Sequence, residues 1–494
     1  MTFSRNKILI ILIVFSILFA RLWKVESLFN FNFSEEMQAH MAWEQVKNFH
    51  PIWIGVSAAN INYYLGPGFT YLNALLFKIS NGNPAFMAWF SALFGLVTIA
   101  SIYFIVSNLF SKRVAIFTII IYGFSTLINL HDRRFWNPTP IPFITIWMIF
   151  SLTKAKKNPK WLVLTAVLIG AAFHTHLTLL LFIIPTLYIV YLSLKKNSLK
   201  TNIKVGILAF IVYLIVTSPL IVFDIVHNFD NLMMPLRIIS GTQKADLNQV
   251  SIANIQGHIK ELSSAFGRLW FIKLHTNPHD EIVLESHLVK TYGNPILSLL
   301  TYGALLFFIV KNRKQGFEIF VIYALAIITA FIIYPSYNPE YYLMSLLTIL
   351  TIAIGFTLDK LSLNFSVPLV ILFVIFNIYS VVTLSDKYGL TVRAELVKKT
   401  MQKIGDKSFE LQTFGEFEKP QYSYAGWRYL FKHYGKTPAQ SNVDSVLGWI
   451  YPDEISNKTP ELKVIVSDTI EPTLDARPQN IVKNGVYSAY IYKN

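Results

Sequence analysis

The chain has 494 residues, of which 53% are hydrophobic, 15% aromatic and only 14% charged. Soluble domains carry about 25% charged residues, so this composition excludes an ordinary soluble domain and indicates a polytopic membrane protein. We attribute the net charge of +15 to cytoplasmic loops and not to nucleic-acid binding. The absence of Cys excludes a disulfide framework, a thiolate metal site and a cysteine nucleophile.

Apolar runs follow one another along the chain, each long enough to cross roughly 30 Å of hydrocarbon as a helix. The first has a basic flank but no small-residue cleavage pattern, so it is expected to be a retained helix. The runs cover residues 8–24, 84–110, 114–131, 138–153, 161–174, 177–194, 204–223, 293–310, 316–334, 342–358 and 366–384. The membrane part is therefore expected to be all-α, with about eleven transmembrane helices.

Lys and Arg occupy alternate connections between these runs, as the cytoplasmic loops of membrane proteins do. They lie at Arg5 and Lys7, at Lys112 and Arg113, in 154–160, 195–200 and 311–314, and at Lys360. We therefore expect a cytoplasmic N-terminus and an outward C-terminus, most plausibly in a bacterial cytoplasmic membrane. The other connections, including 25–83 and 131–137, then face outward.

The first outward loop contains "SEEMQAHMAWEQVKNF", which predicts a surface helix with Ser34 as its N-cap. At 100° per residue Glu35 lies within an apolar stripe, and Glu36 lies on the polar side with His40. Acidic residues in a first turn also merely complement the helix dipole. A carboxylate on an apolar face would instead have a raised pKa suited to proton transfer, so Glu35 is a candidate base and Glu36 is expected to be mostly dispensable.

The connection "HDRRFWNPTP" at 131–140 places several polar and aromatic side chains at the outer membrane surface. Arginines that flank a span often only anchor it to lipid headgroups. Two adjacent arginines on the outward side favour a bound phosphate, because guanidinium groups grip phosphate oxygens bidentately. The candidate residues are Asp132, Arg133, Arg134, Trp136 and Asn137.

Other polar groups also lie next to spans on the outward side. They are His176 in "FHTHLT", Asp224 and His227 at i, i+3 spacing in "FDIVHNF", and Tyr342 in "PEYYLM". For the histidines of "FHTHLT" a polar cap at the end of a span is favoured over a metal-ligand role, and Tyr is common in the aromatic belt. Because all of these groups are expected on the outward side of the membrane, they nevertheless predict one substrate site beneath the outer loops.

The tail from residue 386 to 494 becomes polar and charged. It contains helix-like segments at 390–404 and 425–435 and strand-like segments at 463–468 and 487–492. We expect a small outward α/β domain after a membrane domain at 1–385.

These segments, in this order, resemble the C superfamily of polytopic glycosyltransferases that use polyprenyl-phosphate sugars. That superfamily includes the dolichyl-phosphate-mannose protein mannosyltransferases and the aminoarabinose transferases of lipid A. An acidic pair opens the family's first outer loop, and here Glu35 stands where an aspartate is usual. Its bacterial members have an Arg three residues before "WNP", here Arg133. Similar segments are "YYLGPGFTYLNALLF" at 63–77, "HLT" at 176–178, "PLIVFDIVHNF" at 219–229 and "YY" at 341–342.

The resemblance implies an inverting transfer of a sugar from a polyprenyl-phosphate donor to an acceptor hydroxyl on a glycan, lipid or protein. It implies Glu35 as the base, Arg133 joined by Arg134 on the departing phosphate, and a surface helix at 63–77. No metal or other cofactor is expected, because the membrane region has no outward Asp-x-Asp.

A transporter or lipid-linked glycan flippase is the competing class, although the spans have few ionisable residues and no repeats. A third possible class is a receptor-like or assembly protein that works through its outer tail.

Overall fold

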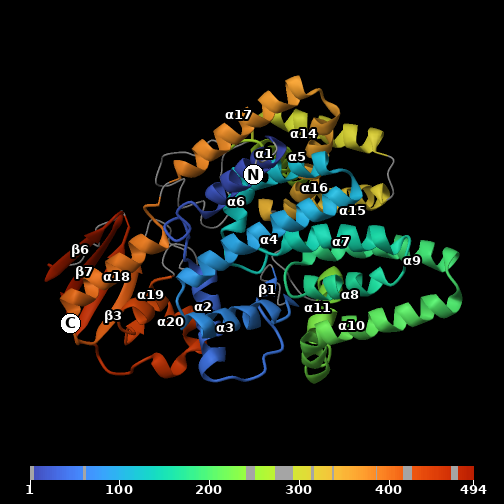
Figure 1. The fold of residues 1–494 in the computed structure, drawn as a ribbon. Helices are drawn as coiled ribbons and strands as arrows, with labels where there is room; N and C mark the ends of the chain where they lie inside the picture. The colour runs from blue at the N-terminus through green and yellow to red at the C-terminus, as the bar shows by residue number, and fades with distance from the viewer. Residues whose placement is uncertain are drawn as a thin grey trace.

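The computed structural model describes residues 5–58, 63–240, 251–272, 293–312, 316–335, 339–384, 386–414, 426–468 and 477–494. It consists of a large helical bundle and a small C-terminal unit built on a sheet, with the helices α2 and α3 between them (Figure 1).

An apolar helix occupies each of the predicted runs. The helices are α1 (Arg5–Leu22), α4 (Ala85–Leu109), α5 (Lys112–Phe124), α6 (Thr126–Asp132), α7 (Ile141–Ala155), α8 (Trp161–Ala172), η1 (Leu177–Phe182) with α9 (Ile183–Lys196), α10 (Leu199–Val226), α14 (Pro295–Lys311), α15 (Phe317–Ile333), η2 (Glu340–Leu343) with α16 (Met344–Lys360), and α17 (Leu363–Val382).

Not every one of these helices is long enough to span a bilayer by itself. Within the described residues, 5 are long and apolar enough, and α5 with α6, bent by 69°, would make a sixth. Shorter apolar helices of 10–17 residues fill the remaining predicted runs. A polytopic membrane fold is therefore established, and the number of eleven spans stays a prediction.

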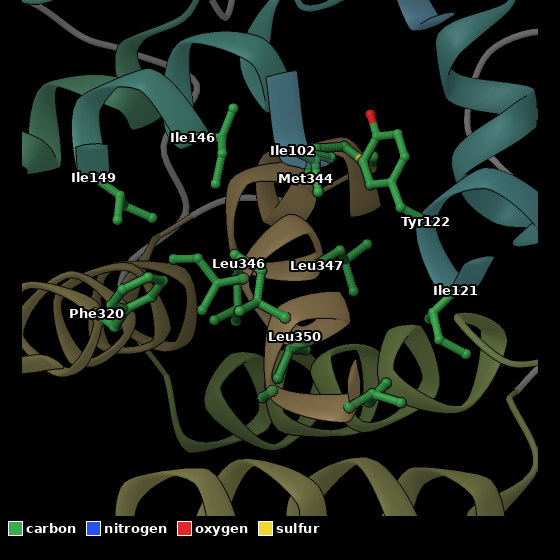
Figure 2. Packing of buried hydrophobic residues seen from close by; sticks show 14 of the residues in the cluster. Ile102, Ile121, Tyr122, Ile146, Ile149, Phe320, Met344, Leu346, Leu347 and Leu350 are labelled. Atoms are coloured by element: carbon green, nitrogen blue, oxygen red, sulfur yellow. The ribbon is translucent and has the colours of Figure 1, made fainter. Parts of the chain in front are cut away.

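Helix α16 forms the centre of the bundle. It is apolar on all sides and buried along almost its whole length, as expected for a helix surrounded by others. Figure 2 shows its leucines among side chains from α4, α5, α7 and α15, including Ile102, Tyr122, Ile146 and Phe320. A methyl group added at Gly355 would lie 2.4 Å from the Thr118 hydroxyl, so α16 and α5 approach closely there. Helices α10 and α17 instead expose apolar side chains, as lipid-facing helices do.

The described basic connections gather at one end of the bundle. Arg113 at the start of α5 lies 3.3 Å from Asp359 at the end of α16, and Lys156 pairs with Glu318 at the start of α15. The connection between α9 and α10 lies at the end away from the C-terminal sheet (Figure 1). This clustering agrees with the predicted orientation. Arg313 and Lys314 lie outside the described residues.

Two surface helices cover the opposite end of the bundle. The N-cap of helix α2 (Phe33–Lys47) is Asn32, which lies two residues before Ser34, the predicted cap. Helix α3 (Gly68–Ser80) does not continue into α4, so the apolar segment 63–77 includes a separate surface helix, as the resemblance implies. The Asn73 side-chain amide donates to the Gln38 carbonyl oxygen at 2.9 Å and ties α3 to α2. The other elements outside the predicted runs are β1 (Ser57–Ala58), β2 (Tyr63–Tyr64), α11 (Asp230–Ile239) and α12 (Ile252–Arg268).

The C-terminal unit is a five-stranded mixed sheet with strand order β4-β3-β5-β7-β6. Its elements are α18 (Leu390–Ile404), β3 (Phe409–Phe414), α19 (Trp427–Tyr434), β4 (Gln440–Ser441), α20 (Asp444–Leu447), η3 (Gly448–Ile450), η4 (Pro452–Glu454), β5 (Leu462–Ser467), β6 (Asn480–Asn484) and β7 (Tyr487–Lys493). Strands β3, β4 and β5 are parallel, and β7 is antiparallel to β5 and β6. Both helix-like and both strand-like segments of the tail are confirmed.

Candidate active site

Side chains from four separate segments meet at the end of the bundle beneath α2. We call them the outer cluster: Glu35, Arg134, Trp136, His176, Tyr341 and Tyr342. All but Tyr341 are candidate site residues predicted from the sequence, and Tyr341 belongs to the "YY" segment on which the family resemblance partly rests. Asn137 supports the cluster from outside, because its side-chain amide donates to the Thr175 carbonyl at 2.7 Å.

Glu35 lies in the first turn of α2 and is 1% exposed. One carboxylate oxygen accepts a hydrogen bond from the Asn32 backbone N–H at 3.2 Å, and the other lies 3.9 Å from a terminal nitrogen of Arg134. Burial raises the pKa of the Glu35 carboxyl, and the nearby Arg134 charge only partly opposes it. Glu35 therefore has the environment of a general base.

Arg134 extends from the connection between α6 and α7. Its guanidinium carbon lies 3.9 Å from the centre of the Trp136 ring. The Thr139 hydroxyl donates to the Arg134 carbonyl at 2.7 Å and accepts from the Trp136 N–H at 3.3 Å, which closes the loop on itself. Within the described part of the chain, the Arg134 side chain has one ion pair, the long one to Glu35. It is 13% exposed, so its donors are available to an anion.

Arg133 points the other way, toward the end of α1. Its guanidinium donates to the carbonyls of Ala20 at 3.1 Å and Trp23 at 2.9 Å, and to the Asn129 side chain at 3.0 Å. Burial and the charge of Arg21 lower the pKa of Arg133 to about 9, so it stays charged at neutral pH. Its remaining nitrogen, Nη1, is buried with no partner among the described residues. Most of this arginine is thus occupied in holding α1.

Asp132 lies away from the outer cluster and stabilises the bend between α5 and α6. It accepts from Arg21 at 2.6 Å and from the Tyr122 hydroxyl at 3.2 Å. Arg21 also donates to the carbonyls of Tyr122 at 2.6 Å and Gly123 at 2.9 Å. The structure therefore gives Asp132 an intramolecular ionic partner.

Aromatic rings form the other wall of the outer cluster. Tyr341 packs edge-on against Trp136 with ring centres 4.5 Å apart, and His176 lies 5.5 Å from Tyr341 and 5.0 Å from Tyr342. Nδ1 of His176 accepts from the Thr178 N–H at 3.3 Å and caps η1. Burial, followed by the neighbouring His131, lowers the pKa of His176 to about 3, so the ring is neutral.

Asp224 and His227 are not part of the cluster. Asp224 is buried at the end of α10 and accepts from the Leu232 N–H at 3.0 Å. Helix α10 ends at Val226, so His227 turns outward, is exposed and stacks on Phe223. The i, i+3 spacing does not bring the two side chains to one site, because the helix stops between them.

Glu36 is buried as completely as Glu35, although the helical pattern placed it on a polar side. Its carboxylate accepts from the backbone N–H groups of Gly426 at 2.6 Å and Tyr429 at 2.9 Å, at the start of α19. The first part of the polar side of α2 thus faces the C-terminal unit, whereas Lys47 at the end of the helix is exposed. His40 on the same side is also buried, between the rings of Tyr429 and Tyr451.

Sequence reasoning did not identify Arg268 at the end of α12. It donates to Glu340 at 2.8 Å in a buried ion pair next to Tyr341. A lone Arg in a long outward loop gave no signal in the sequence, because its partner lies 72 positions away.

Comparison with known proteins gives a family match over part of the chain. The family model described as dolichyl-phosphate-mannose-protein mannosyltransferase matches residues 65–223, a range that includes Arg134, Trp136 and His176. Among curated proteins no match was found.

Solved structures give a likeness of fold. The structure of ArnT from Cupriavidus metallidurans bound to undecaprenyl phosphate matches with a TM-score of 0.62 at 13% identity, covering 99% of this chain and 98% of that chain, and apo ArnT gives the same values. An oligosaccharyltransferase of Archaeoglobus fulgidus matches more distantly, with a TM-score of 0.46 at 12% identity over 94% of this chain and 69% of that one. With the ArnT-like fold over nearly the whole chain and the mannosyltransferase match over residues 65–223, the resemblance to the C superfamily of glycosyltransferases that use polyprenyl-phosphate sugars is confirmed.

Proposed function

We propose that this chain is an integral membrane glycosyltransferase that moves a sugar from a polyprenyl-phosphate donor to an acceptor hydroxyl, at the outer face of the membrane and with inversion. The acceptor is a glycan, a lipid or a protein. The fold and the family match support the donor class, since undecaprenyl phosphate is bound by ArnT. The basic connections at the far end of the bundle support the outward orientation.

The observation that carries the proposal is the pairing of Glu35 with Arg134, 3.9 Å apart beneath α2. A displacement at an anomeric carbon needs a base near the attacking hydroxyl and a cation near the departing phosphate. Glu35 is a buried carboxylate with a raised pKa, and Arg134 is a guanidinium with available donors. The two required groups thus lie at one site, and the sugar has to enter between them and separate the pair, so that the acceptor attacks from the Glu35 side while the phosphate leaves toward Arg134.

The transfer proceeds in one displacement. The acceptor oxygen forms a bond to the anomeric carbon while its proton passes to Glu35. The bond from that carbon to the phosphate oxygen breaks, and its electron pair leaves with the polyprenyl phosphate. Arg134 stabilises the charge that grows on the phosphate. Attack opposite the leaving group inverts the configuration.

The aromatic wall suits the sugar. Trp136, Tyr341 and Tyr342 offer apolar ring faces and edges, and the neutral His176 adds no charge to them. The indole N–H of Trp136 is buried without a hydrogen-bond partner in the described residues, so it can donate to a sugar hydroxyl. No metal enters the proposed step, because the leaving group is a lipid monophosphate held by arginine.

The test is transfer of label from a polyprenyl-phosphate sugar in membranes that contain the protein, with release of polyprenyl phosphate measured in parallel. Glu35→Gln keeps size and hydrogen-bonding shape but cannot take the proton, so transfer should fall by about 10²- to 10⁴-fold with donor binding retained. Glu44→Gln changes a half-exposed carboxylate of the same helix and is the matched control. Movement of label across the membrane without release of polyprenyl phosphate would instead identify a flippase.

A further inference from the structure

We propose that Glu36 is a positioning residue through which the C-terminal unit holds the catalytic base in place. This inference rests on the proposed function of Glu35. It assigns the neighbouring carboxylate to a different task, which is to fix α2 against the start of α19.

The contact between Glu36 and α19 is specific. Both carboxylate oxygens are used, one by the Gly426 N–H at 2.6 Å and one by the Tyr429 N–H at 2.9 Å. The first N–H groups of a helix have no partner within that helix, and the helix dipole favours a negative charge beside them. Glu36 is fully buried, so water does not compete for these donors. The carboxylate therefore acts as an N-terminal cap supplied from another part of the chain.

The same unit also grips the chain just before α2. Arg393 on α18 donates to the Phe31 carbonyl at 2.9 Å and contacts the Asn32 side chain at 3.4 Å. The Asn32 backbone N–H donates to Glu35, so Asn32 links Arg393 to the proposed base. Gly426 packs so closely that an added methyl group would lie 2.0 Å from the Phe31 carbonyl oxygen. The start of α2 is thus held at several points by the C-terminal unit.

Consecutive residues on a helix point about 100° apart, so Glu35 and Glu36 face different parts of the molecule. Glu36 is fixed to the C-terminal unit, and Glu35 faces Arg134 of the bundle. Rotation or sliding of α2 would change the separation of 3.9 Å between the base and the arginine. A misplacement of about 1 Å in such a site can cost about 100-fold in rate.

The charged groups near the two carboxylates differ accordingly. Arg134 and Arg393 face Glu35, while Arg428 and Arg393 face Glu36. Burial is the main influence on Glu35 and raises its pKa. Release of α2 would admit water to Glu35, so the pKa of the base would move down toward its ordinary value.

The experiment compares kcat, the KM for the polyprenyl-phosphate sugar and the pH profile of kcat in wild type, Glu36→Gln and Tyr434→Phe. Glu36→Gln keeps one acceptor oxygen, which can serve one of the two backbone N–H groups. The side-chain NH₂ group replaces the other oxygen and cannot accept from the second N–H, so the cap is broken. Tyr434→Phe removes a hydrogen bond of 3.3 Å between the same helix α19 and Asn83, without touching α2, and serves as the control.

We expect Glu36→Gln to lower kcat at least tenfold at matched folded protein, with KM for the donor within a few-fold. The acidic limb of its pH profile should move to lower pH, and the control should keep the wild-type limb. A lower kcat with an unmoved acidic limb would mean that Glu36 affects the rate without changing the surroundings of Glu35, and would overturn the inference. So would an unchanged kcat.

If Glu36→Gln does not accumulate, Arg393→Lys provides the second test. It keeps the charge but loses the fork that reaches Phe31 and Asn32, and should shift the limb in the same direction. The two proposals fail differently. A wild-type protein that transfers no sugar refutes the proposed function, whereas an active wild type with unshifted variants refutes the positioning role.

Discussion

Replacement of Arg134 and of Arg133 by Gln should give two different phenotypes. Hydrogen bonds that involve a charged group contribute about 1.5–3 kcal/mol each. Since about 1.4 kcal/mol corresponds to a factor of ten, loss of the Arg134 contact to the donor phosphate should lower kcat/KM by about 10- to 100-fold. The side chain is partly exposed and has one long ion pair, so stability should change little.

Arg133→Gln should instead destabilise the fold. The change removes the Arg133 donor from the Trp23 carbonyl and from the Asn129 side-chain oxygen, whereas the Ala20 carbonyl keeps a second donor, the Asn129 amide at 2.9 Å. Each such group costs about 1–3 kcal/mol, so the free energy of unfolding should fall by about 2–6 kcal/mol. The rate per folded molecule should fall less than in Arg134→Gln, since the Arg133 guanidinium is directed to the end of α1 and Arg134 is the arginine beside Glu35.

The assay for both variants is the initial transfer rate against donor concentration, with the thermal unfolding midpoint measured in the same detergent. The rates are compared above the acidic limb, because Arg134 lowers the pKa of Glu35 and its removal moves that limb to higher pH. Normal donor use by Arg134→Gln, together with loss of donor use by Arg133→Gln at an unchanged midpoint, would refute this division of roles.

The remaining predictions concern pH, stability and orientation. Because Glu35 must be ionised to take a proton and burial raises its pKa above the ordinary value of 4.5, kcat should rise with pH between 4.5 and neutrality; a flat profile would exclude Glu35 as the base. Asp132→Asn breaks a buried ion pair and should cost about 3–5 kcal/mol of unfolding free energy, whereas Asp386→Asn breaks an exposed pair and should cost about 0–1 kcal/mol. Equal midpoints in these two variants would contradict the structural role of Asp132. Reporter fusions at residues 157 and 440 should lie on opposite sides of the membrane, and a common side would break the predicted topology.

The apolar helices could be predicted from sequence because a segment in hydrocarbon must satisfy its own backbone hydrogen bonds, and this requires long apolar runs. The amphipathic helix at 390–404 was predicted with its observed ends for a related reason, since its buried face repeats with the helical period. The strands β3, β4 and β6 were missed. Two residues of β4 carry no pattern, and β6 is largely exposed at a sheet edge.

Within the site, the sequence predicted which residues lie at the outer end but not which way they point. Arg133 and Arg134 are adjacent in one turn, and their directions are set by different partners. Arg133 is drawn to the Trp23 carbonyl, 110 positions earlier, while the Thr139 hydroxyl fixes the Arg134 backbone locally. No local pattern contains the first of these contacts. The family motif therefore identified the loop, whereas the structure shows that Arg134 and not Arg133 lies beside Glu35, which supports the proposal that Arg134 meets the donor.

The acidic pair shows the same limit more sharply. Helical periodicity correctly separated Glu35 from Glu36, but it assigned Glu36 to water because it cannot include a partner 390 positions away. Once the C-terminal unit covers that side, the two carboxylates are both buried, and we propose that one serves proton transfer and the other the placement of α2. Loss of activity on mutation of either residue consequently cannot identify the base. The direction in which the acidic limb moves can, because Glu35→Gln removes the ionisation itself, whereas Glu36→Gln leaves it in place and changes only its surroundings.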